Sequence, residues 1–372
     1  MSKILFIVGT RPELIKVAPV IQEFKSNSFK DFLIVNTGQH KELLENQWQI
    51  FNIKPDFNLD ILKKNNSLSG LTINAIKKLD NLILDLKKAK KFPKVIFAQG
   101  DTTSVMAASI VSFYHKIKFA HLEAGLRTYD MFNPFPEEMN RRVASIISNY
   151  NFVPTELAKE NLIREGVNPK SIYLVGNTVV DALKFITKTK IFNSLVFSDK
   201  RIESLMNSKK RIVLVTFHRR ENHNNLFELI RAIDYLAKNK DYNFIWPVHK
   251  NPNIRKPILA SSLKSNKNIL LTEPLNYFEL IKIMSKSTLI ITDSGGIQEE
   301  APSFSVPVIV LRKVTERPEG LNLHFSKLVN CYYEAIIKTV GNLNLSLDKN
   351  VKNPYGDGKA AKRIYKILCK DL

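Results

Sequence analysis

The segment KILFIVGTRPELIKVAPVIQEF, residues 3–24, decides the fold class of this chain. Five consecutive apolar residues, 4–8, run into Gly9-Thr10, and an amphipathic stretch follows at 14–24. A short and wholly apolar run is typical of a parallel strand covered on both faces, and apolar residues at three- and four-residue spacing predict a helix. The chain therefore begins with a predicted βα unit.

The same alternation recurs almost to the end of the chain. In the first half the further strand-like runs are 32–36, 95–98, 118–122 and 151–153, and 71–86 has helical periodicity. In the second half the runs are 211–217, 243–248, 268–271, 288–292 and 306–311. Two successive βα series predict an α/β fold of two doubly wound, Rossmann-like domains. We place these domains at 1–170 and 171–355, and we expect a C-terminal helix within 356–372 that packs back on the N-terminal domain.

Composition narrows the function classes. The 372 residues include 56 Lys+Arg and 35 Asp+Glu, a net charge of +21. Such an excess favours polyanions, anionic lipid or phosphorylated small molecules as partners, unless the lysines only solvate helix faces. No basic run contains interleaved stacking aromatics, so we expect no nucleic-acid partner. The two cysteines, Cys331 and Cys369, exclude a disulfide framework or a zinc ribbon.

Membrane insertion is not expected. The apolar run 4–8 is too short for a signal-peptide core, and no run approaches the ~18 residues of a transmembrane helix. We therefore expect a cytoplasmic protein.

The turn Gly9-Thr10-Arg11-Pro12-Glu13 follows the first strand and is a candidate phosphate site. Thr10 is a plausible helix cap, and Arg11 lies beside backbone N–H groups that a helix leaves unpaired. An ordinary capped turn is the alternative. The sequence has neither GxGxxG nor GxxxxGK[ST], which disfavours bound NAD and P-loop chemistry.

Three carboxylates follow strands or begin a helix in the first half: Asp101, Glu123 and Glu137. The carboxyl ends of parallel strands meet at one sheet edge, so we expect these side chains in one site. Like charges raise one another's pKa, which suits general acid/base catalysis. Metal binding is the competing reading, but no His is spaced for joint ligation, and we expect no metal.

The second half carries cations and a glycine turn at its strand ends. His218, Arg219 and Arg220 follow one strand, and Ser294-Gly295-Gly296 follows another. Backbone N–H groups of such a turn bind phosphate, and a nearby Glu accepts hydrogen bonds from a ribose. The segment 311–319 after the next strand adds the cations Arg312, Lys313 and Arg317, and a bidentate Arg is the natural phosphate clamp. Together these features predict a nucleotide site.

Ten motifs in a fixed order resemble the non-hydrolysing UDP-N-acetylglucosamine 2-epimerases. They are GTRPE (9–13), TGQH (37–40), GDTTS (100–104), HLEAGLRT (121–128), PFPEEMNR (134–141), GNTVVDA (176–182), HRREN (218–222), PVHKNP (247–252), TDSGGIQEEAP (292–302) and TERPE (315–319). The resemblance implies a fold like that of GT-B glycosyltransferases, a homodimer, and a UDP-sugar in an interdomain cleft. It further implies interconversion of UDP-GlcNAc and UDP-ManNAc without metal or cofactor, by elimination of UDP to a 2-acetamidoglucal and re-addition. The product would supply ManNAc units for cell-surface polysaccharide.

The resemblance also implies roles for single residues. The catalytic residues would be Asp101, Glu123, Glu137 and His218. The residues binding the UDP-sugar would be Arg11, Lys16, Arg141, Ser294, Gly295, Gly296, Glu300 and Arg317, with Glu300 on the ribose and with Arg11, His218 and Arg317 on the diphosphate.

Gln39, Arg219 and His249 match parts of a second site at which UDP-GlcNAc activates bacterial members of the family. An expected Arg-Gln pair is replaced by Asn65-Asn66, which leaves activation open. Phe217 and Ser305 also depart from the pattern, Ser305 standing where Gly is common. Three alternatives remain: a 2-epimerase of another UDP-2-acetamido sugar, a GT-B glycosyltransferase, and a basic nucleic-acid or surface-binding protein that merely carries this fold.

Overall fold

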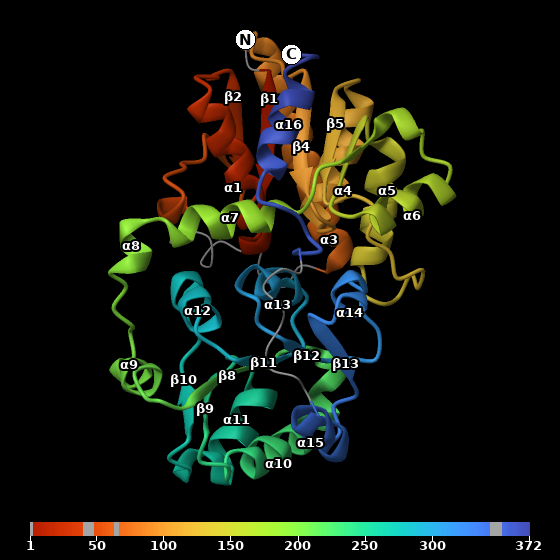
Figure 1. Cartoon of the computed structure of the whole chain (residues 1–372). Coiled ribbons are helices and arrows are strands. Elements are labelled where there is room, and N and C mark those ends of the chain that lie inside the picture. The colour runs from red at the N-terminus through yellow and green to blue at the C-terminus, as the bar shows by residue number, and fades with distance from the viewer. Residues whose placement is uncertain (1–2, 40–47, 63–66, 343–351) are drawn as a thin grey trace. The chain divides into compact units, whose positions relative to one another are not determined.

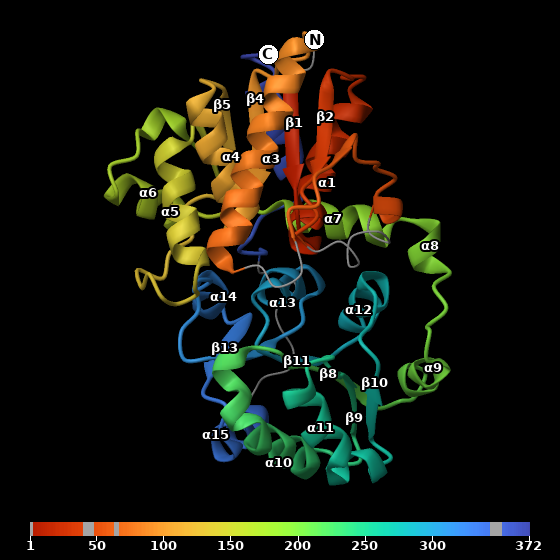
Figure 2. The ribbon, with the colours of Figure 1, turned by 180° about the vertical axis from the view of Figure 1, so that it is seen from behind.

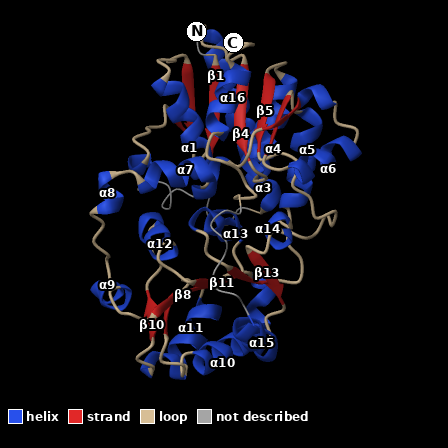
Figure 3. Cartoon of the chain, viewed as in Figure 1, coloured by secondary structure: helices blue, strands red, loops and turns tan. Residues whose placement is uncertain are grey.

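A computed structural model describes residues 3–39, 48–62, 67–342 and 352–372. Its contacts divide the chain into a first unit, Met1–Ala182 with Tyr355–Leu372, and a second unit, Leu183–Pro354. Strands alternate with helices throughout both units (Figure 3). The first division falls at Ala182, twelve residues beyond the position 170 expected from the sequence.

The first unit is built around a seven-stranded parallel sheet of order β3-β2-β1-β4-β5-β6-β7 (Figure 1). Its strands are β1 (Ile4–Val8), β2 (Phe32–Asn36), β3 (Phe57–Asn58), β4 (Val95–Gln99), β5 (Lys118–Leu122), β6 (Tyr150–Val153) and β7 (Ile172–Leu174). Its helices are α1 (Arg11–Ser26), α3 (Leu68–Lys88), α4 (Thr103–Tyr114), α5 (Glu137–Ile147), α6 (Glu156–Arg164), η1 (Pro169–Ser171) and α16 (Ala360–Leu368), and α7 (Thr178–Thr187) crosses into the second unit.

The apolar run of β1 alternates between the two faces of this sheet. Phe6 contacts Phe24 of α1 with ring centroids 6.0 Å apart, and Phe24 contacts Tyr365 of α16 at 4.9 Å. Leu5 and Ile7 belong to a buried cluster with side chains of α3 and α4, which cover the face opposite α16 (Figures 1 and 2). Burial of each such side chain contributes about 1.5–3 kcal/mol. The C-terminal helix therefore completes the core of the first unit.

The second unit repeats the design with a six-stranded parallel sheet of order β10-β9-β8-β11-β12-β13. Its strands are β8 (Arg211–Thr216), β9 (Tyr242–Pro247), β10 (Ile269–Thr272), β11 (Leu289–Thr292), β12 (Val308–Leu311) and β13 (Ser326–Val329). Its helices are α8 (Lys190–Asn193), α9 (Lys200–Met206), η2 (Arg220–Asn225), α10 (Leu226–Leu236), α11 (Pro252–Ala260), η3 (Ser262–Ser265), α12 (Tyr277–Met284), α13 (Gly295–Glu300), η4 (Ala301–Phe304), α14 (Glu319–Asn322) and α15 (Tyr333–Asn342).

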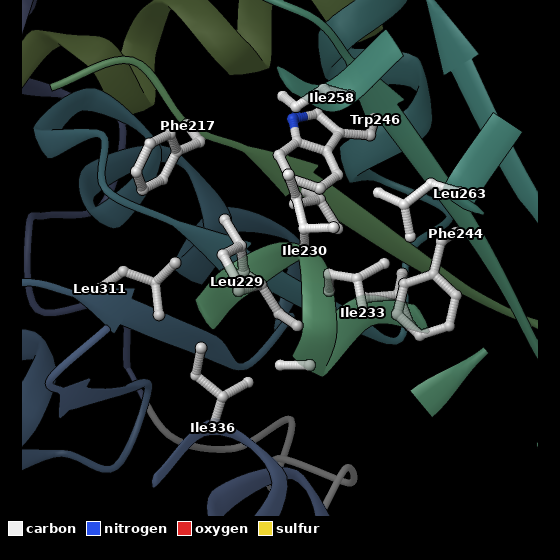
Figure 4. Close-up of a cluster of buried hydrophobic side chains, with 14 of the residues drawn as sticks. Phe217, Leu229, Ile230, Ile233, Phe244, Trp246, Ile258, Leu263, Leu311 and Ile336 are labelled. Atoms are coloured by element: carbon white, nitrogen blue, oxygen red, sulfur yellow. The ribbon is translucent and has the colours of Figure 1, made fainter. Parts of the chain in front are cut away.

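Two apolar layers sandwich the second sheet. Val213 and Val215 of β8 face one layer, which includes Trp246 of β9 and Ile233 of α10 (Figure 4). Leu214 faces the other layer with side chains of α9, α12 and α13. The alternation along β8 explains why its sequence is apolar on both faces.

In each sheet the direction in which successive strands are added reverses at one pair of neighbouring strands. In the first sheet the order reverses between β1 and β4, and in the second between β8 and β11. Ligands of doubly wound sheets bind beyond the carboxyl ends of the strands at such a switch point. The segments after these four strands are 9–11, 100–102, 217–219 and 293–295, and they carry six of the predicted site residues: Arg11, Asp101, His218, Arg219, Ser294 and Gly295. No helix among the described residues is long and apolar enough to span a membrane.

Candidate functional site

Glu123 lies at the end of β5 in the first unit and is held by side chains from three other segments. Lys16 Nζ of α1 lies 2.6 Å from Glu123 Oε1, and both side chains are buried. Gln99 of β4 donates from Nε2 to Oε2, and Asn177 donates from Nδ2 to Oε1 at 3.5 Å. The backbone of Glu123 has φ +68°, a left-handed conformation that is strained for a non-glycine residue. The surroundings therefore fix both the backbone and the carboxylate.

Asp101 follows β4 and is paired with Arg141 of α5. Arg141 Nη2 lies 2.7 Å from Asp101 Oδ2, and its Nη1 lies 3.2 Å from Glu138 Oε2. Asn140 donates to the backbone carbonyl of Asp101 at 2.9 Å. The side chain of Arg141 is only 4% exposed, whereas that of Asp101 is 30% exposed. The structure thus places Arg141 behind Asp101, and Asp101 is the member of the pair that solvent reaches.

Glu137 and Glu138 begin α5 and have different surroundings. Glu138 is fully buried and accepts backbone N–H groups of Thr128 at 3.1 Å and Tyr129 at 3.3 Å. Glu137 is half-buried at the first position of the helix. Glu138 therefore anchors the preceding loop, and Glu137 is the better placed of the two to meet a ligand.

The turn after β1 carries a buried carboxylate. Glu13 accepts the N–H of Gly9 at 2.5 Å and that of Thr10 at 3.3 Å. Burial raises the pKa of Glu13 to about 7, although hydrogen bonds from Thr102, Gly9 and Thr10 act in the opposite direction. Glu13 thus caps α1, and the half-exposed Arg11 stands at the first helical position.

Two buried polar groups support the strand ends of the first unit. His121 of β5 lies 2.7 Å from the Gly100 carbonyl through Nε2, and burial lowers its pKa to about 4. Ser104 of α4 contacts the Thr37 hydroxyl at 2.9 Å and donates to Gln39 Oε1 at 2.8 Å. A neutral His121 therefore fixes the backbone next to Asp101, and Gln39 lies against the start of α4. Asn65-Asn66 lie outside the described residues.

In the second unit, Asp293 organises the end of β8. Its carboxylate accepts backbone N–H groups of His218 at 3.0 Å and Arg219 at 2.9 Å, and His218 Nδ1 lies 3.0 Å from Oδ1. Burial alone raises the pKa of Asp293, but these partners outweigh it and the pKa lies below its usual value. The half-exposed His218 ring is thereby oriented by a buried anion. Asp293 was not among the predicted site residues. Its position directly before the turn Ser294-Gly295-Gly296 is the sequence signal that could have pointed to it.

His249 and Arg219 border the same strand end. The His249 ring lies 6.1 Å from that of His218, and burial followed by the charge of His218 lowers its pKa. Burial and the neighbouring Arg312 lower the pKa of Arg219. His218, Arg219 and His249 are therefore gathered at one corner of the second unit.

The glycine turn after β11 lies under an arginine. A Cβ atom at Gly295 would come within 2.8 Å of Arg317 Nη1, so a larger residue there would require the guanidinium to move. Arg317 Nε lies 2.5 Å from Glu299 Oε1, and Nη1 pairs with Glu316. The Ser294 N–H donates to Thr292 Oγ1 at 2.9 Å, and Gly296 is exposed at the start of α13. A guanidinium and helix-start N–H groups are thus presented together.

Acidic partners surround these cations. Glu316 also lies 2.9 Å from Arg312 Nη1, and Arg312 Nε lies 3.2 Å from Glu221 Oε1. Burial raises the pKa of Glu316, but Arg317 and Arg312 outweigh it and hold that pKa far below its usual range. Glu300 is buried and accepts the Tyr277 hydroxyl at 2.8 Å. Within the described residues no group of three or more His, Cys, Asp or Glu is placed to hold a metal.

Carboxylates at the switch point of one doubly wound unit, and a His, an Arg and a glycine turn at that of another, define an α/β protein of the type that binds nucleotide sugars. The family described as UDP-N-acetylglucosamine 2-epimerase matches residues 22–369. The chain belongs to this family.

Individual relatives align with almost the whole chain. The chain is 42% identical to a UDP-N-acetylglucosamine 2-epimerase of Campylobacter jejuni, over 100% of this chain and 98% of the relative. The crystal structure of UDP-GlcNAc 2-epimerase from Neisseria meningitidis bound to UDP-GlcNAc superposes with a TM-score of 0.88 at 40% identity, covering 99% of this chain and 100% of that one. A glycosyltransferase from Rickettsia africae, at 13% identity and a TM-score of 0.57 over 99% and 98% of the two chains, shares the fold alone.

Proposed function

We propose that this protein is a non-hydrolysing UDP-N-acetylglucosamine 2-epimerase that interconverts UDP-GlcNAc and UDP-ManNAc. The observation that carries the proposal is the placement of Asp101 and Glu123 at the ends of the adjacent strands β4 and β5. Each carboxylate has a buried cation as partner, Arg141 or Lys16. A glycosyltransferase that shares the fold has no evident need for both.

The chemistry of epimerisation explains this arrangement. The hydrogen at C2 of the sugar is weakly acidic, so its removal by a carboxylate must accompany cleavage of the bond between C1 and the diphosphate oxygen. The electron pair of the C2–H bond becomes the C1=C2 double bond of the glycal, and the electron pair of the broken C1–O bond leaves with UDP. In the return step the UDP oxygen attacks C1 and a proton returns to C2 on the opposite face. Carboxylates of the first unit would remove the proton from C2 and return it.

The second unit supplies groups suited to the leaving diphosphate. Arg317 and His218 offer cationic or N–H donors, and the helix start at Gly295 and Gly296 offers backbone N–H groups. Glu300 is expected to accept hydrogen bonds from the ribose. Arg11 of the first unit is assigned to the diphosphate and Glu137 to the sugar or its C2 proton.

The decisive test is proton NMR of UDP-GlcNAc incubated with the pure protein in D2O. We expect UDP-ManNAc signals together with deuterium at C2, which requires cleavage of the C2–H bond. Asp101→Asn is expected to lower turnover about 1000-fold, within the range set by loss of a general acid or base. Free UDP with a released sugar, or no exchange with UDP-GlcNAc, would contradict the proposal, and turnover of another UDP-2-acetamido sugar would reassign the substrate.

The assembly and regulation of the protein are part of the same proposal. Phe113 and Tyr114 at the end of α4 and Ile146 at the end of α5 are 64%, 72% and 82% exposed, an apolar surface suited to a second copy in a homodimer. Light scattering tests the dimer.

Activation by UDP-GlcNAc would involve Gln39, Arg219 and His249, and it predicts a sigmoidal dependence of rate on UDP-GlcNAc. We further propose a cytoplasmic location and a product that feeds cell-surface polysaccharide.

A further inference from the structure

Glu123 is held by neutral amides as well as by a cation. Gln99 reaches Oε2 and Asn177 reaches Oε1 at 3.5 Å, while Lys16 lies on Oε1. The sheet register explains the first contact, because Gln99 pairs with Leu122, the residue directly before Glu123. Both amide side chains are about 4% exposed, so their partners lie inside the protein.

Asn177 is itself fixed by the C-terminal segment Tyr355–Leu372. Its N–H donates to the Tyr355 carbonyl at 2.7 Å, and its Oδ1 accepts the Val179 N–H at 3.0 Å. Asp181, one turn further along α7, accepts the Ala360 and Ala361 N–H groups at 3.2 and 3.0 Å. The end of the chain therefore holds the segment that carries Asn177.

We propose that Gln99 and Asn177 are positioning residues that hold the Glu123 carboxylate in the orientation that the epimerisation needs. The proposal rests on the proposed function of Glu123. The left-handed backbone at Glu123 favours it, because strained backbone persists where surrounding contacts determine it. Uncharged donors fix the direction of the carboxylate without adding the positive charge that a second lysine would bring.

Gln99→Met is the principal test, since methionine has similar length and no donor. Hydrogen bonds to a charged group are worth enough that their loss lowers kcat about ten- to a hundred-fold. Losing a donor favours the protonated carboxyl, so the acid limb of the pH–rate profile moves to higher pH. KM for UDP-GlcNAc is expected to stay within about threefold, because the loss falls on positioning rather than on ground-state binding. Gln99→His, which retains an N–H donor, is expected to recover part of kcat.

Gln22→Met is the matched control. Gln22 on α1 donates to the Phe51 backbone carbonyl and lies outside the site, so the same substitution removes a donor without touching Glu123. The unfolding temperatures of Gln99→Met and Gln22→Met measure any loss of stability that is unrelated to the orientation of Glu123. A Gln99→Met variant with the kcat and pH profile of Gln22→Met would overturn the proposal.

Asn177→Asp tests the second donor independently. Aspartate keeps the acceptor for the Val179 N–H but places a negative oxygen toward Glu123. We expect a larger upward shift of the acid limb than in Gln99→Met, and an unshifted profile would exclude Asn177 from the role.

If the wild-type enzyme leaves UDP-GlcNAc unchanged, the proposed function is contradicted, but the proposal that Gln99 and Asn177 orient the Glu123 carboxylate is not. In that case 13C NMR of the Glu123 side-chain carboxyl, assigned with Glu123→Gln, gives the answer without turnover. Titration at higher pH in Gln99→Met than in wild type supports positioning, and identical titrations refute it.

Discussion

Replacing Asp293 by asparagine tests how the second unit prepares His218. The carboxylate is fully buried and accepts two backbone N–H groups, and His218 Nδ1 lies 3.0 Å away. Asparagine has the same shape but places an N–H donor where one of these donors now points. A hydrogen bond to a charged acceptor is worth about 1 kcal/mol more than one to a neutral acceptor, so three contacts lose about 3 kcal/mol. Removing a buried charge returns part of this loss, and we expect about 2 kcal/mol of destabilisation.

The substitution also removes the anion that orients His218. Beside the carboxylate, Nδ1–H donates to Asp293, so the ring is fixed with Nε2 available to a ligand. An asparagine amide is a weaker, neutral partner and can present its N–H group instead, so this ring orientation is no longer enforced. We expect kcat to fall at least 100-fold, as when another buried carboxylate that orients a histidine is replaced by its amide.

Urea unfolding followed by tryptophan fluorescence measures the stability of the second unit. Trp246 lies in its core, and a Trp48→Phe background leaves Trp246 as the reporter because the chain has two tryptophans. Asp199→Asn is the control, since Asp199 caps α9 at the surface of the same unit. The pKa of Asp293 is lower in the folded protein than its unfolded value near 4, so the ionised carboxylate stabilises the fold above that pH. This stabilisation is lost as the pH falls through the folded pKa. The free energies of unfolding of wild type and variant should therefore converge in acid. Equal urea midpoints at pH 7 together with unchanged turnover would refute the reasoning.

Two further predictions concern stability. Ser305 has φ +54°, so Ser305→Gly is expected to stabilise the second unit by about 0.5–1 kcal/mol, whereas Ser285→Gly, at φ −64°, is expected to destabilise it by a similar amount in the same urea assay. Burial raises the pKa of Asp181 to about 6 despite two backbone donors, so its charge costs stability above that pH and the cost disappears as pH falls toward 4. The wild-type unfolding temperature should therefore rise relative to Asp181→Asn between pH 7 and pH 4.5, and a constant difference would contradict this.

The sequence predicted the strands that carry strong apolar runs. β1, β2 and β5 begin and end at the expected residues, because each is covered on both faces. Three strands were missed. β3 has two residues, β7 is partly exposed, and β13 contains Ser326 and Lys327. These strands lie at or beside a sheet edge, where burial no longer requires continuous apolar residues.

The sequence predicts candidate residues for the site but not the side chains that they contact. Lys16 and Glu123 are 107 residues apart, and their contact follows only once β1, β4 and β5 are known to be neighbours. Arg141 was expected to bind substrate, and the structure places it against Asp101 and Glu138 inside the first unit. Spacing along a chain does not reveal such pairs, because they depend on the order of strands in the sheet.

Ser305 shows how a local departure from the family pattern can be tolerated. A glycine is expected in the turn before β12, and the structure gives Ser305 the left-handed conformation that explains this preference. The strain of about 1 kcal/mol at a serine is small against the burial of β12, whose four residues are all inaccessible. The departure therefore affects stability and leaves the fold unchanged.

The two units use one architecture for opposite electrostatic tasks. At the switch point of the first unit, Asp101 is the more exposed member of its ion pair and the buried Arg141 lies behind it. In the second unit the order is reversed, because the more exposed His218 is backed by the buried Asp293, and Arg317 by Glu299. The proposed elimination of a diphosphate needs a proton acceptor and an anion acceptor at the same time, and in the proposed assignment each has a counter-charge of its own. Removing a backing charge should therefore impair the group in front of it even where substrate never touches the altered residue.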